Sequence, residues 1–318
     1  MEPQWPGMQR LPGGTFTMGS DRYYPEEKPR RRVRVDPFWI DVTPVTNRQF
    51  AEFVHKTGYR TLAEIAPDPA HYPGMSPAMA KAGSLVFERP RGPVDLRDFR
   101  QWWTFRFGAS WHRPLGERSS TAGLEDHPVV HIAYQDAEAY ARWAGKSMPT
   151  EAEWEYAARG GLEAEFAWGD ELAPGGRMLA NYWQGTFPWE NHLLDGWERT
   201  SPVRDFPLNG YDLSDMIGNV WEWTCDWYAQ PDTHAKPAGS CCIPANPRGG
   251  GEQGSYDPCT PGVRIGRKVL KGGSHLCAPN YCQRYRPAAR YAQPVDTSTC
   301  HVGFRCIVRE SATGIQSK

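Results

Sequence analysis

Residues 218–223 read Gly218-Asn219-Val220-Trp221-Glu222-Trp223, and the pattern they begin continues to Trp227. From Val220 onward, valine and polar residues alternate with tryptophan and cysteine. Alternation with a period of two is typical of a β-strand. This segment therefore predicts a short strand with a tryptophan-rich face. Outward from it, residues 160–318 predict loops joined by further short strands.

The composition also favours a fold with many loops. The chain has 318 residues, including 32 Gly and 29 Pro together with 14 Trp, 14 Tyr and 12 Phe. Disordered chains rich in proline and glycine contain few aromatic residues, and a long helical bundle tolerates few helix breakers. We therefore expect an α+β fold in one compact, loop-rich domain over residues 12–310, with tails at 1–11 and 311–318.

Other strands and loops are predicted along the chain. Residues 14–19, 33–42 and 302–308 each predict a strand. Residues 60–125 hold seven prolines and an aromatic cluster that begins at Trp102-Trp103, so they predict a long, ordered loop of the kind that often carries function. Residues 236–262 predict a surface excursion.

Three helices are predicted from capping and helical spacing. Thr46 and Gln49 form a capping box before a helix at 47–57, which Gly58 ends. A second helix is expected at 135–144. A third follows the capping box of Thr150 and Glu153, and glycine ends it at 160–161.

The charge balance excludes several partner classes. The chain has 36 Lys and Arg against 37 Asp and Glu, a net charge of −1, so no strong field attracts nucleic acid or an anionic membrane. The basic run at 30–32 is interpreted as the polar face of a strand. No apolar run approaches the roughly 20 residues that cross a bilayer, and residues 1–14 lack the apolar core of a secretory signal. We expect a cytoplasmic protein.

All eight cysteines follow residue 224. Disulfide frameworks are typical of short secreted chains. We therefore favour the hypothesis that cysteines in the C-terminal third of the chain form a chemically active site. The cysteines are Cys225, Cys241, Cys242, Cys259, Cys277, Cys282, Cys300 and Cys306.

Cys277 and Cys282 stand in a distinctive setting. Four residues separate them, which alone is compatible with buried free thiols, a disulfide or half of a zinc site. Gly272-Gly273 allows close backbone approach, and arginines at 284, 286 and 290 would lower a thiol pKa if they lie close in space. A thiolate pair in this setting suits a redox role or a soft metal, above all copper(I).

On these residues the chain resembles the formylglycine-generating enzymes, the sulfatase-modifying factor family, and more closely its prokaryotic type. The matching segments cover almost the whole chain in order. Most are shared with a broad superfamily that includes iron-dependent sulfoxide synthases and non-catalytic members, and they imply a C-type-lectin-like fold. The cysteine pair belongs to the catalytic branch. The segments are 11–14 with 18–19, 37–41 with 45–47, 127–131, 149–156, 218–223, 271–286 and 303–306.

The resemblance implies an oxidase that acts on a polypeptide. The family converts the cysteine of a Cys-x-Pro-x-Arg motif in an unfolded sulfatase to Cα-formylglycine with dioxygen and a thiol reductant. Cys277 and Cys282 would bind copper(I), and the substrate thiolate would join as a third sulfur ligand. Oxygen activated at the metal would remove a hydrogen from the substrate's β-carbon, and the resulting thioaldehyde would hydrolyse.

The resemblance also implies further site residues. Ser274, Tyr281 and Trp221 match residues around the oxygen and substrate-thiol pocket, with ordinary packing and loop capping as the alternative. Arg286 and Arg290 are expected to hold either the substrate or the loop.

Two structural calcium sites are implied as well, since hard oxygen ligands suit Ca²⁺. The first would use the side chains of Asn181 and Asp195 with the carbonyls of Tyr182 and Trp197. The second would use the side chains of Asp215 and Glu222 with the carbonyls of Gly218 and Val220.

The chain departs from the family in its cysteines. Positions that pair in the disulfides of vertebrate members are Ala141, Ala158 and Pro287 here, so Cys306 is expected to be a free thiol.

Four other cysteines have no role implied by the family, and several interpretations stay open. These cysteines are Cys241, Cys242, Cys259 and Cys300. The open interpretations are surface thiols, a local disulfide, or a zinc site built from Cys241, Cys242, Cys259 and His234.

Two rival functions remain open. One is a non-catalytic binding module of the same fold, which the cysteine pair argues against. The other is an iron-dependent oxygenase of small thiols with ligands such as His127, His131 and His275. The sulfoxide synthases take their histidines largely from a separate helical domain that is absent here, so packing or backbone hydrogen bonding is expected for all three.

Overall fold

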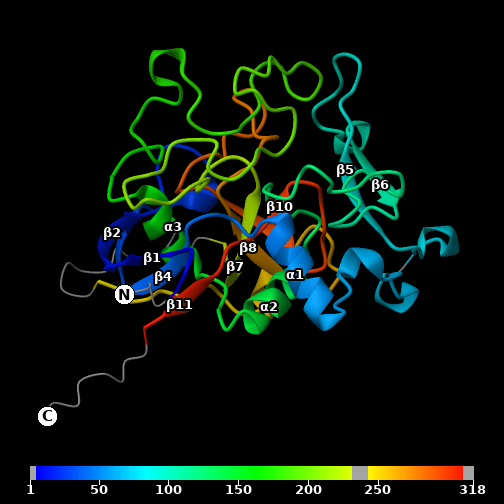
Figure 1. Cartoon of the computed structure of the whole chain (residues 1–318), viewed down its shortest axis with the longest axis horizontal. Helices are drawn as coiled ribbons and strands as arrows, with labels where there is room; N and C mark the ends of the chain where they lie inside the picture. The colour runs from blue at the N-terminus through cyan, green and yellow to red at the C-terminus, as the bar shows by residue number, and fades with distance from the viewer. Residues whose placement is uncertain (1–4, 73, 231–242, 311–318) are drawn as a thin grey trace, which may run out of the picture.

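The computed structural model describes residues 5–72, 74–230 and 243–310. In these ranges three helices and four small sheets are joined by long loops (Figure 1). The largest sheet has the order β10-β7-β8-β9. Its strands are β10 (Val302–Gly303), β7 (Trp221–Trp227), β8 (Arg267–Lys271) and β9 (Arg290–Pro294). This arrangement confirms the expected loop-rich α+β fold.

The other sheets are smaller and antiparallel. One has the order β1-β4-β11, with β1 (Met8–Leu11), β4 (Phe38–Asp41) and β11 (Ile307–Arg309). Two hairpins follow: β2 (Gly14–Met18) with β3 (Arg31–Val35), and β5 (Gly83–Phe87) with β6 (Trp103–Phe107). The β5–β6 hairpin lies at one side of the molecule, away from the β1-β4-β11 sheet (Figure 1).

Strand β7 confirms the prediction for residues 220–227. It pairs parallel with β10 and antiparallel with β8, where Glu222 lies opposite Lys271. Trp221 and Trp223 are buried, as a tryptophan-rich face requires. The polar side of the strand is buried too, because Glu222 and Thr224 have no exposed surface. Each polar group on that side must therefore find a partner inside the protein.

The three α-helices confirm the helix predictions, and two of them begin with the predicted capping boxes. Helix α1 (Asn47–Thr57) has a capping box in which the Thr46 amide donates to Gln49 Oε1 at 2.9 Å, and Gly58 ends it at φ 68°. Helix α2 spans Tyr134–Trp143. Helix α3 (Glu151–Arg159) begins with the box of Thr150 and Glu153. No helix in the described part of the chain is long and apolar enough to cross a membrane.

Several predicted boundaries are wrong. Residues 33–42 form two strands, β3 and β4, because Pro37 interrupts the ladder and sends β4 into another sheet. Residues 302–308 likewise divide between β10 and β11. Residues 60–125 are not one long loop, since they contain the β5–β6 hairpin.

The predicted tail at residues 1–11 is also shorter than expected. Met8–Leu11 forms β1, which pairs with β4 from Met8 opposite Asp41 to Leu11 opposite Phe38. Met8 and Leu11 are buried, and this burial stabilises the strand. The predicted tail at 311–318 lies outside the described residues.

Arg305, in the loop between β10 and β11, reaches the buried carboxylate of Glu222. Its Nε and Nη2 donate to the two carboxylate oxygens at 2.7 and 2.8 Å, and both side chains are fully buried. The Trp154 indole of α3 donates to the same carboxylate at 2.8 Å. Arg305 also donates to four backbone carbonyls, those of Asp41, Val42, Ser214 and Asp215.

We expect Arg305→Met to lower the free energy of unfolding by about 3–5 kcal/mol, because it leaves Glu222 buried without its countercharge. Urea denaturation followed by tryptophan fluorescence measures this. Arg10→Met is the matched control, since Arg10 pairs with Glu310 at the surface and such pairs contribute about 1 kcal/mol or less. A loss below about 1 kcal/mol in Arg305→Met would contradict the assignment.

Candidate active site

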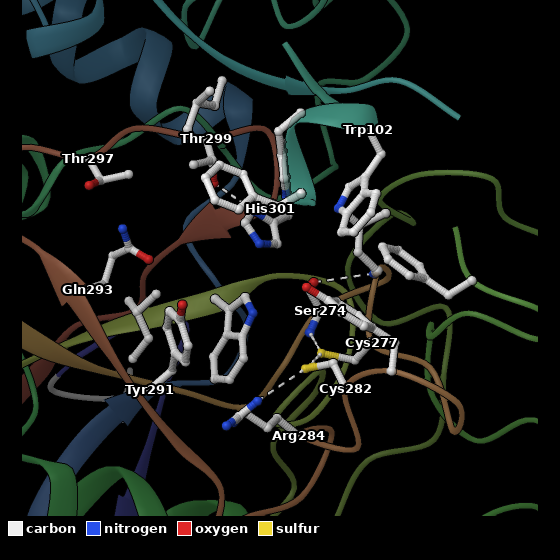
Figure 2. Close-up of a pocket in the computed structure, with 18 residues that line it drawn as sticks. Trp102, Ser274, Cys277, Cys282, Arg284, Tyr291, Gln293, Thr297, Thr299 and His301 are labelled. Carbon is white, nitrogen blue, oxygen red and sulfur yellow. Dashed lines mark hydrogen bonds between the residues drawn. The ribbon is translucent and has the colours of Figure 1, made fainter. Parts of the chain in front are cut away.

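A pocket of about 480 Å³ opens beside the large sheet. The loop after β8 forms one side of it and carries Ser274, Cys277 and Cys282. Residues 297–301 and the segment that leads into β6 form the other, with Trp102 and His301 facing the sulfur atoms across the cavity (Figure 2). Segments that lie almost 200 residues apart in the sequence therefore meet here.

Cys277 and Cys282 lie together at the pocket wall. Their sulfur atoms are 3.3 Å apart, and both residues are free thiols. The Ser274 amide donates to Cys277 Sγ at 3.4 Å, and the Cys282 amide donates to the Ala278 carbonyl at 2.9 Å, which closes the turn between the cysteines. Of the alternatives left open by the spacing, the structure has two neighbouring free thiols.

The glycines before the cysteines are required by geometry. Gly272 and Gly273 have φ of 90° and 70°, a region that side chains with a Cβ rarely adopt. A Cβ on Gly273 would also lie 2.7 Å from the Arg284 carbonyl oxygen. The loop that carries the cysteines can therefore bring Gly273 and Arg284 together only because residue 273 is glycine.

The two thiols differ in acidity. The hydrogen bond from the Cys277 thiol, with the Arg284 guanidinium 3.9 Å away, lowers the pKa of Cys282 to about 7. Burial raises the pKa of Cys277 well above its ordinary value, and the neighbouring Cys282 adds to that rise. Near neutral pH, Cys282 is thus the thiolate and Cys277 the thiol that donates to it.

Arg284 is the arginine at the pocket. Its guanidinium lies over the Tyr24 ring, 3.8 Å from the centroid, and pairs with Glu26 at 2.5 Å. Figure 2 shows it pointing toward Cys282. Of the three arginines that the sequence brings near the cysteines, this one lines the cavity.

Arg286 and Arg290 do not line the pocket. Arg286 is buried in an ion pair with Glu27 at 2.5 Å, and Arg290 pairs with Glu151 at 2.8 Å. Carboxylates occupy both guanidinium groups, and these contacts are those of the loop-holding role. The alternative role in substrate binding stays a prediction.

Ser274, Tyr281 and Trp221 all line the pocket. Ser274 is buried, and its Oγ accepts from the Leu276 amide at 3.2 Å. Tyr281 stacks on Phe187 with the ring centroids 4.7 Å apart. The location agrees with the resemblance, while the chemical roles of the three stay predictions.

Several pocket residues were missed by the sequence analysis. They are Leu85, Phe99, Phe187, Tyr291, Gln293, Thr297, Thr299 and His301, as well as Trp102 and Trp103, which were noted as an aromatic cluster without a site. Of these residues, only Trp102 and Trp103 could have been suspected from the sequence, because two adjacent tryptophans are unusual in a loop. Burial lowers the pKa of His301 to about 3, so this imidazole is neutral at physiological pH.

The first predicted calcium set holds an unused oxygen. Asn181 Oδ1 is buried and has no hydrogen-bond partner among the described residues. The Asp195 carboxylate accepts from the amides of Tyr182 at 3.1 Å and Trp197 at 2.9 Å. Gln184 Nε2 lies between the Tyr182 carbonyl and the Asp195 carboxylate. A buried oxygen without a partner, in a set that also offers a carboxylate and carbonyls, fits a hard cation.

The second set fits a cation less well. Both oxygens of Glu222 accept from Arg305, which neutralises that carboxylate. Asp215 accepts from Ser214 Oγ at 2.7 Å and from the Arg204 amide at 3.1 Å. Of the two carboxylates in this set, Asp215 is the one with no ion pair among the described residues; burial raises its pKa, and nearby Arg305 offsets part of that rise.

The remaining cysteines are separate from the site. Cys306 is a buried free thiol, as expected. Cys225, Cys259 and Cys300 are also free thiols within the described ranges. The suggested zinc site falls mostly outside the described residues, which include only Cys259 of its four members.

The three candidate histidines make the expected contacts. His127 Nδ1 contacts Thr200 Oγ1 at 3.1 Å. His131 uses both ring nitrogens, on Ser84 Oγ and the Pro114 carbonyl. His275 Nδ1 contacts the Asn219 carbonyl at 2.9 Å. Among the described residues, no three His, Cys, Asp or Glu side chains form a group that could hold a metal.

Comparison with known proteins finds relatives along nearly the whole chain. Residues 1–310 match the family model described as "Sulfatase-modifying factor enzyme 1-like domain". The chain is 54% identical over 297 residues to the formylglycine-generating enzyme of Mycobacterium tuberculosis, covering 93% of this chain and 96% of that protein. It is 41% identical to the formylglycine-generating enzyme of Bos taurus, covering 94% of this chain and 74% of the relative.

Two further matches are a relative named as inactive and a more distant solved structure. A Bos taurus protein named "Inactive C-alpha-formylglycine-generating enzyme 2" is 42% identical, with 94% of this chain and 87% of that protein covered. The solved structure of PvdO from Pseudomonas aeruginosa has a TM-score of 0.61 at 23% identity and covers 95% of this chain and 94% of its own. At that identity the likeness shows the fold alone.

We expect iodoacetamide to alkylate Cys282 with a pH midpoint near 7, because Cys282 is thiolate above its pKa of about 7. Peptide mapping by mass spectrometry over pH 5–10 measures the rate at each cysteine. Arg284→Met should raise the midpoint but keep part of the shift, because the hydrogen bond from Cys277 remains, and Arg284→Lys should stay closer to the wild type because the charge remains. A wild-type midpoint of about 9 would contradict the assigned charge state.

Proposed function

Because this chain belongs to the formylglycine-generating enzyme family, we propose that it oxidises a cysteine of an unfolded sulfatase to Cα-formylglycine. The substrate cysteine would lie in a Cys-x-Pro-x-Arg motif, with dioxygen as oxidant and a thiol as reductant. Family membership alone does not carry this proposal, since inactive relatives share the sequence likeness. The observation that carries it is the pair of free thiols, 3.3 Å apart, at the wall of an open pocket.

The donor set of the pocket fits copper(I). Two cysteine sulfurs in contact, one of them a thiolate near neutral pH, are the soft ligands that this ion prefers. Cys277 and Cys282 would hold it. When bound, copper(I) would supply a soft site for the substrate thiolate and the electrons that activate dioxygen.

The residues around the thiols prepare this site. Arg284 supplies positive charge beside Cys282, which stabilises the thiolate and partly balances the negative charge that a second, substrate thiolate brings. The aromatic rings of Trp102, Phe187 and Tyr281 pack edge-on or stacked across the cavity. These rings line the same cavity as the thiols, and Tyr281 is itself exposed to solvent.

The two rival functions have less support. A non-catalytic binding module would have no use for a lowered thiol pKa in an open cavity. The iron-dependent alternative needs free imidazole nitrogens converging on one point, whereas His131 has both nitrogens engaged and His127 contacts Thr200. We also propose a cytoplasmic location, because a reducing compartment suits the free thiols of the described residues.

We propose structural calcium at the first oxygen set. Among the described residues, Asn181 Oδ1 is buried without a hydrogen-bond partner, and burial raises the pKa of Asp195, which a nearby cation would offset. A bound Ca²⁺ would satisfy both groups. At the second set the proposal is weaker, because Arg305 already compensates Glu222.

We expect the copper(I)-loaded protein to convert a Leu-Cys-Thr-Pro-Ser-Arg peptide to its aldehyde in the presence of oxygen and a thiol reductant. Mass spectrometry of the peptide measures the product. Cys277→Ser and Cys282→Ser should each lower the rate by 100-fold or more, because one sulfur ligand is lost. Cys259→Ser is the matched control, since Cys259 is exposed and lies outside the pocket, and it should keep full activity.

Two results would contradict the proposal. The first is the absence of aldehyde when the wild-type protein is assayed with copper(I), which would favour the binding module. Undiminished product in Cys282→Ser would remove the pair from the chemistry.

We expect a calcium chelator to lower the melting temperature by about 5 °C or more, since a ligand at 100 times its Kd contributes about 2.7 kcal/mol. Differential scanning fluorimetry measures this. Asn181→Leu should melt at the chelated temperature and no longer respond to chelator. An unchanged wild-type melting curve would contradict both calcium sites.

A further inference from the structure

We propose that one face of the β5–β6 hairpin docks an apolar segment of the polypeptide substrate, several residues away from its reacting cysteine. We term this surface the hairpin face and define it as Leu85, Phe87, Trp103, Phe105 and Phe107. The inference rests on the proposed function, because it concerns the same substrate and extends its recognition beyond the reacting motif.

The strand register places these five side chains on one side of the hairpin. Leu85 lies opposite Phe105, and Phe87 lies opposite Trp103. Residues directly opposite in an antiparallel pair share a face, and so do alternate residues along one strand. Phe107 therefore continues the row of Trp103 and Phe105.

The inner end of the hairpin face belongs to the pocket. Leu85 and Trp103 line the cavity that holds the cysteines, and the Trp103 ring lies 4.9 Å from that of His301. Phe87 is buried against Trp183, with centroids 5.7 Å apart. This end is fixed in the core and is continuous with the site.

The outer end of the hairpin face is open. Phe105 and Phe107 are 36% and 39% exposed, with ring centroids 5.8 Å apart. Opposite Phe107 stands Gly83, where a Cβ would come within 2.8 Å of the Phe105 ring. Phe99, which also lines the pocket, is 61% exposed just before β6. Contiguous exposed aromatic surface beside a pocket is typical of a binding site.

The charge distribution identifies the occupant as apolar. Arg106 lies between Phe105 and Phe107 in β6, so it points to the opposite side, where it pairs with Glu88 at 2.5 Å. One cation approaches the face at its outer end, where Lys81 Nζ is 5.4 Å from the Phe107 ring. An unfolded chain has leucine and phenylalanine side chains available for such a surface, whereas a folded protein keeps most of them buried.

The length of the hairpin face sets the length of the segment that it can contact. From Trp103 to Phe107 the strand spans about 13 Å at ~3.3 Å per residue. An extended substrate that leaves the pocket along this face would place about four residues beside the row from Trp103 to Phe107.

Binding of peptides that cannot react tests this proposal. Two dye-labelled peptides carry the motif with serine in place of cysteine. One is extended on both sides by about eight residues rich in Leu and Phe, long enough to span the face, and the other by Ser and Thr. We expect fluorescence anisotropy to show about tenfold tighter binding of the apolar peptide. The double variant Phe105→Ser/Phe107→Ser should reduce this preference to less than about twofold.

The control variant is Leu162→Ser, which removes an exposed leucine at the end of α3 and should keep the tenfold preference. Phe107→Lys provides a second variant at a position that is already partly exposed, and it should weaken binding of the apolar peptide alone. Melting temperatures confirm that each variant is folded. Because no reaction is measured, a failure here is distinct from a failure of the oxidation assay.

Three outcomes would overturn the inference. The first is equal binding of both peptides by the wild type. The second is an equal loss of affinity for both peptides in the double variant. That result would mean that Phe105 and Phe107 maintain the shape of the pocket and do not contact the apolar segment. The third is a wild-type dimer in gel filtration that the double variant converts to a monomer, since a second copy of the chain would then cover the face.

Discussion

The buried contact between Arg305 and Glu222 is the constraint on which the rest of this structure depends. A chain with short strands and long loops leaves many backbone carbonyls without ladder partners, and each buried one needs a donor. Arg305 donates to carbonyls of two separate segments, at the end of β4 and before β7, while Glu222 anchors it to β7 and to Trp154 of α3. A guanidinium has five donors in a rigid plane, so one side chain joins elements that no regular sheet connects.

Buried ion pairs also fix both ends of the loop that carries the cysteines, residues 271–286. Lys271, at its start, pairs with Glu155 at 2.9 Å, and Arg286, at its end, pairs with Glu27 at 2.5 Å, all four side chains being buried. Breaking either buried pair would leave an uncompensated charge, so the ends of the loop are strongly fixed. The glycines at 272 and 273 then let the loop fold back on itself. Two thiols held in contact at a cavity are the consequence, and the acidity of Cys282 follows from that contact.

Local signals in the sequence predicted local structure well. The capping boxes at Thr46 and Thr150 define helix starts because both partners lie within four residues. The β5–β6 hairpin was missed because its strands are joined by a long segment with two prolines and pair in a way that no turn motif announces. For the candidate site, the cysteines were singled out by their neighbouring residues, whereas Ser274, Tyr281 and Trp221 came from the family resemblance. Trp102 and His301 were not assigned to it, since they reach the pocket only through tertiary folding. Similarly, the sequence does not show which of the arginines at 284, 286 and 290 lines the pocket, because that depends on the carboxylate with which each one pairs.

We propose that Cys277 and Cys282 form a copper(I) site that accepts the thiol of a peptide substrate. X-ray absorption at the copper edge tests this most directly, because the number and type of ligand atoms are measured without reference to turnover. We expect two sulfur ligands in the copper(I)-loaded protein and three after addition of a Cys-x-Pro-x-Arg peptide under exclusion of oxygen. Nitrogen or oxygen ligands in place of the two sulfurs, or an unchanged sulfur count with peptide, would contradict it.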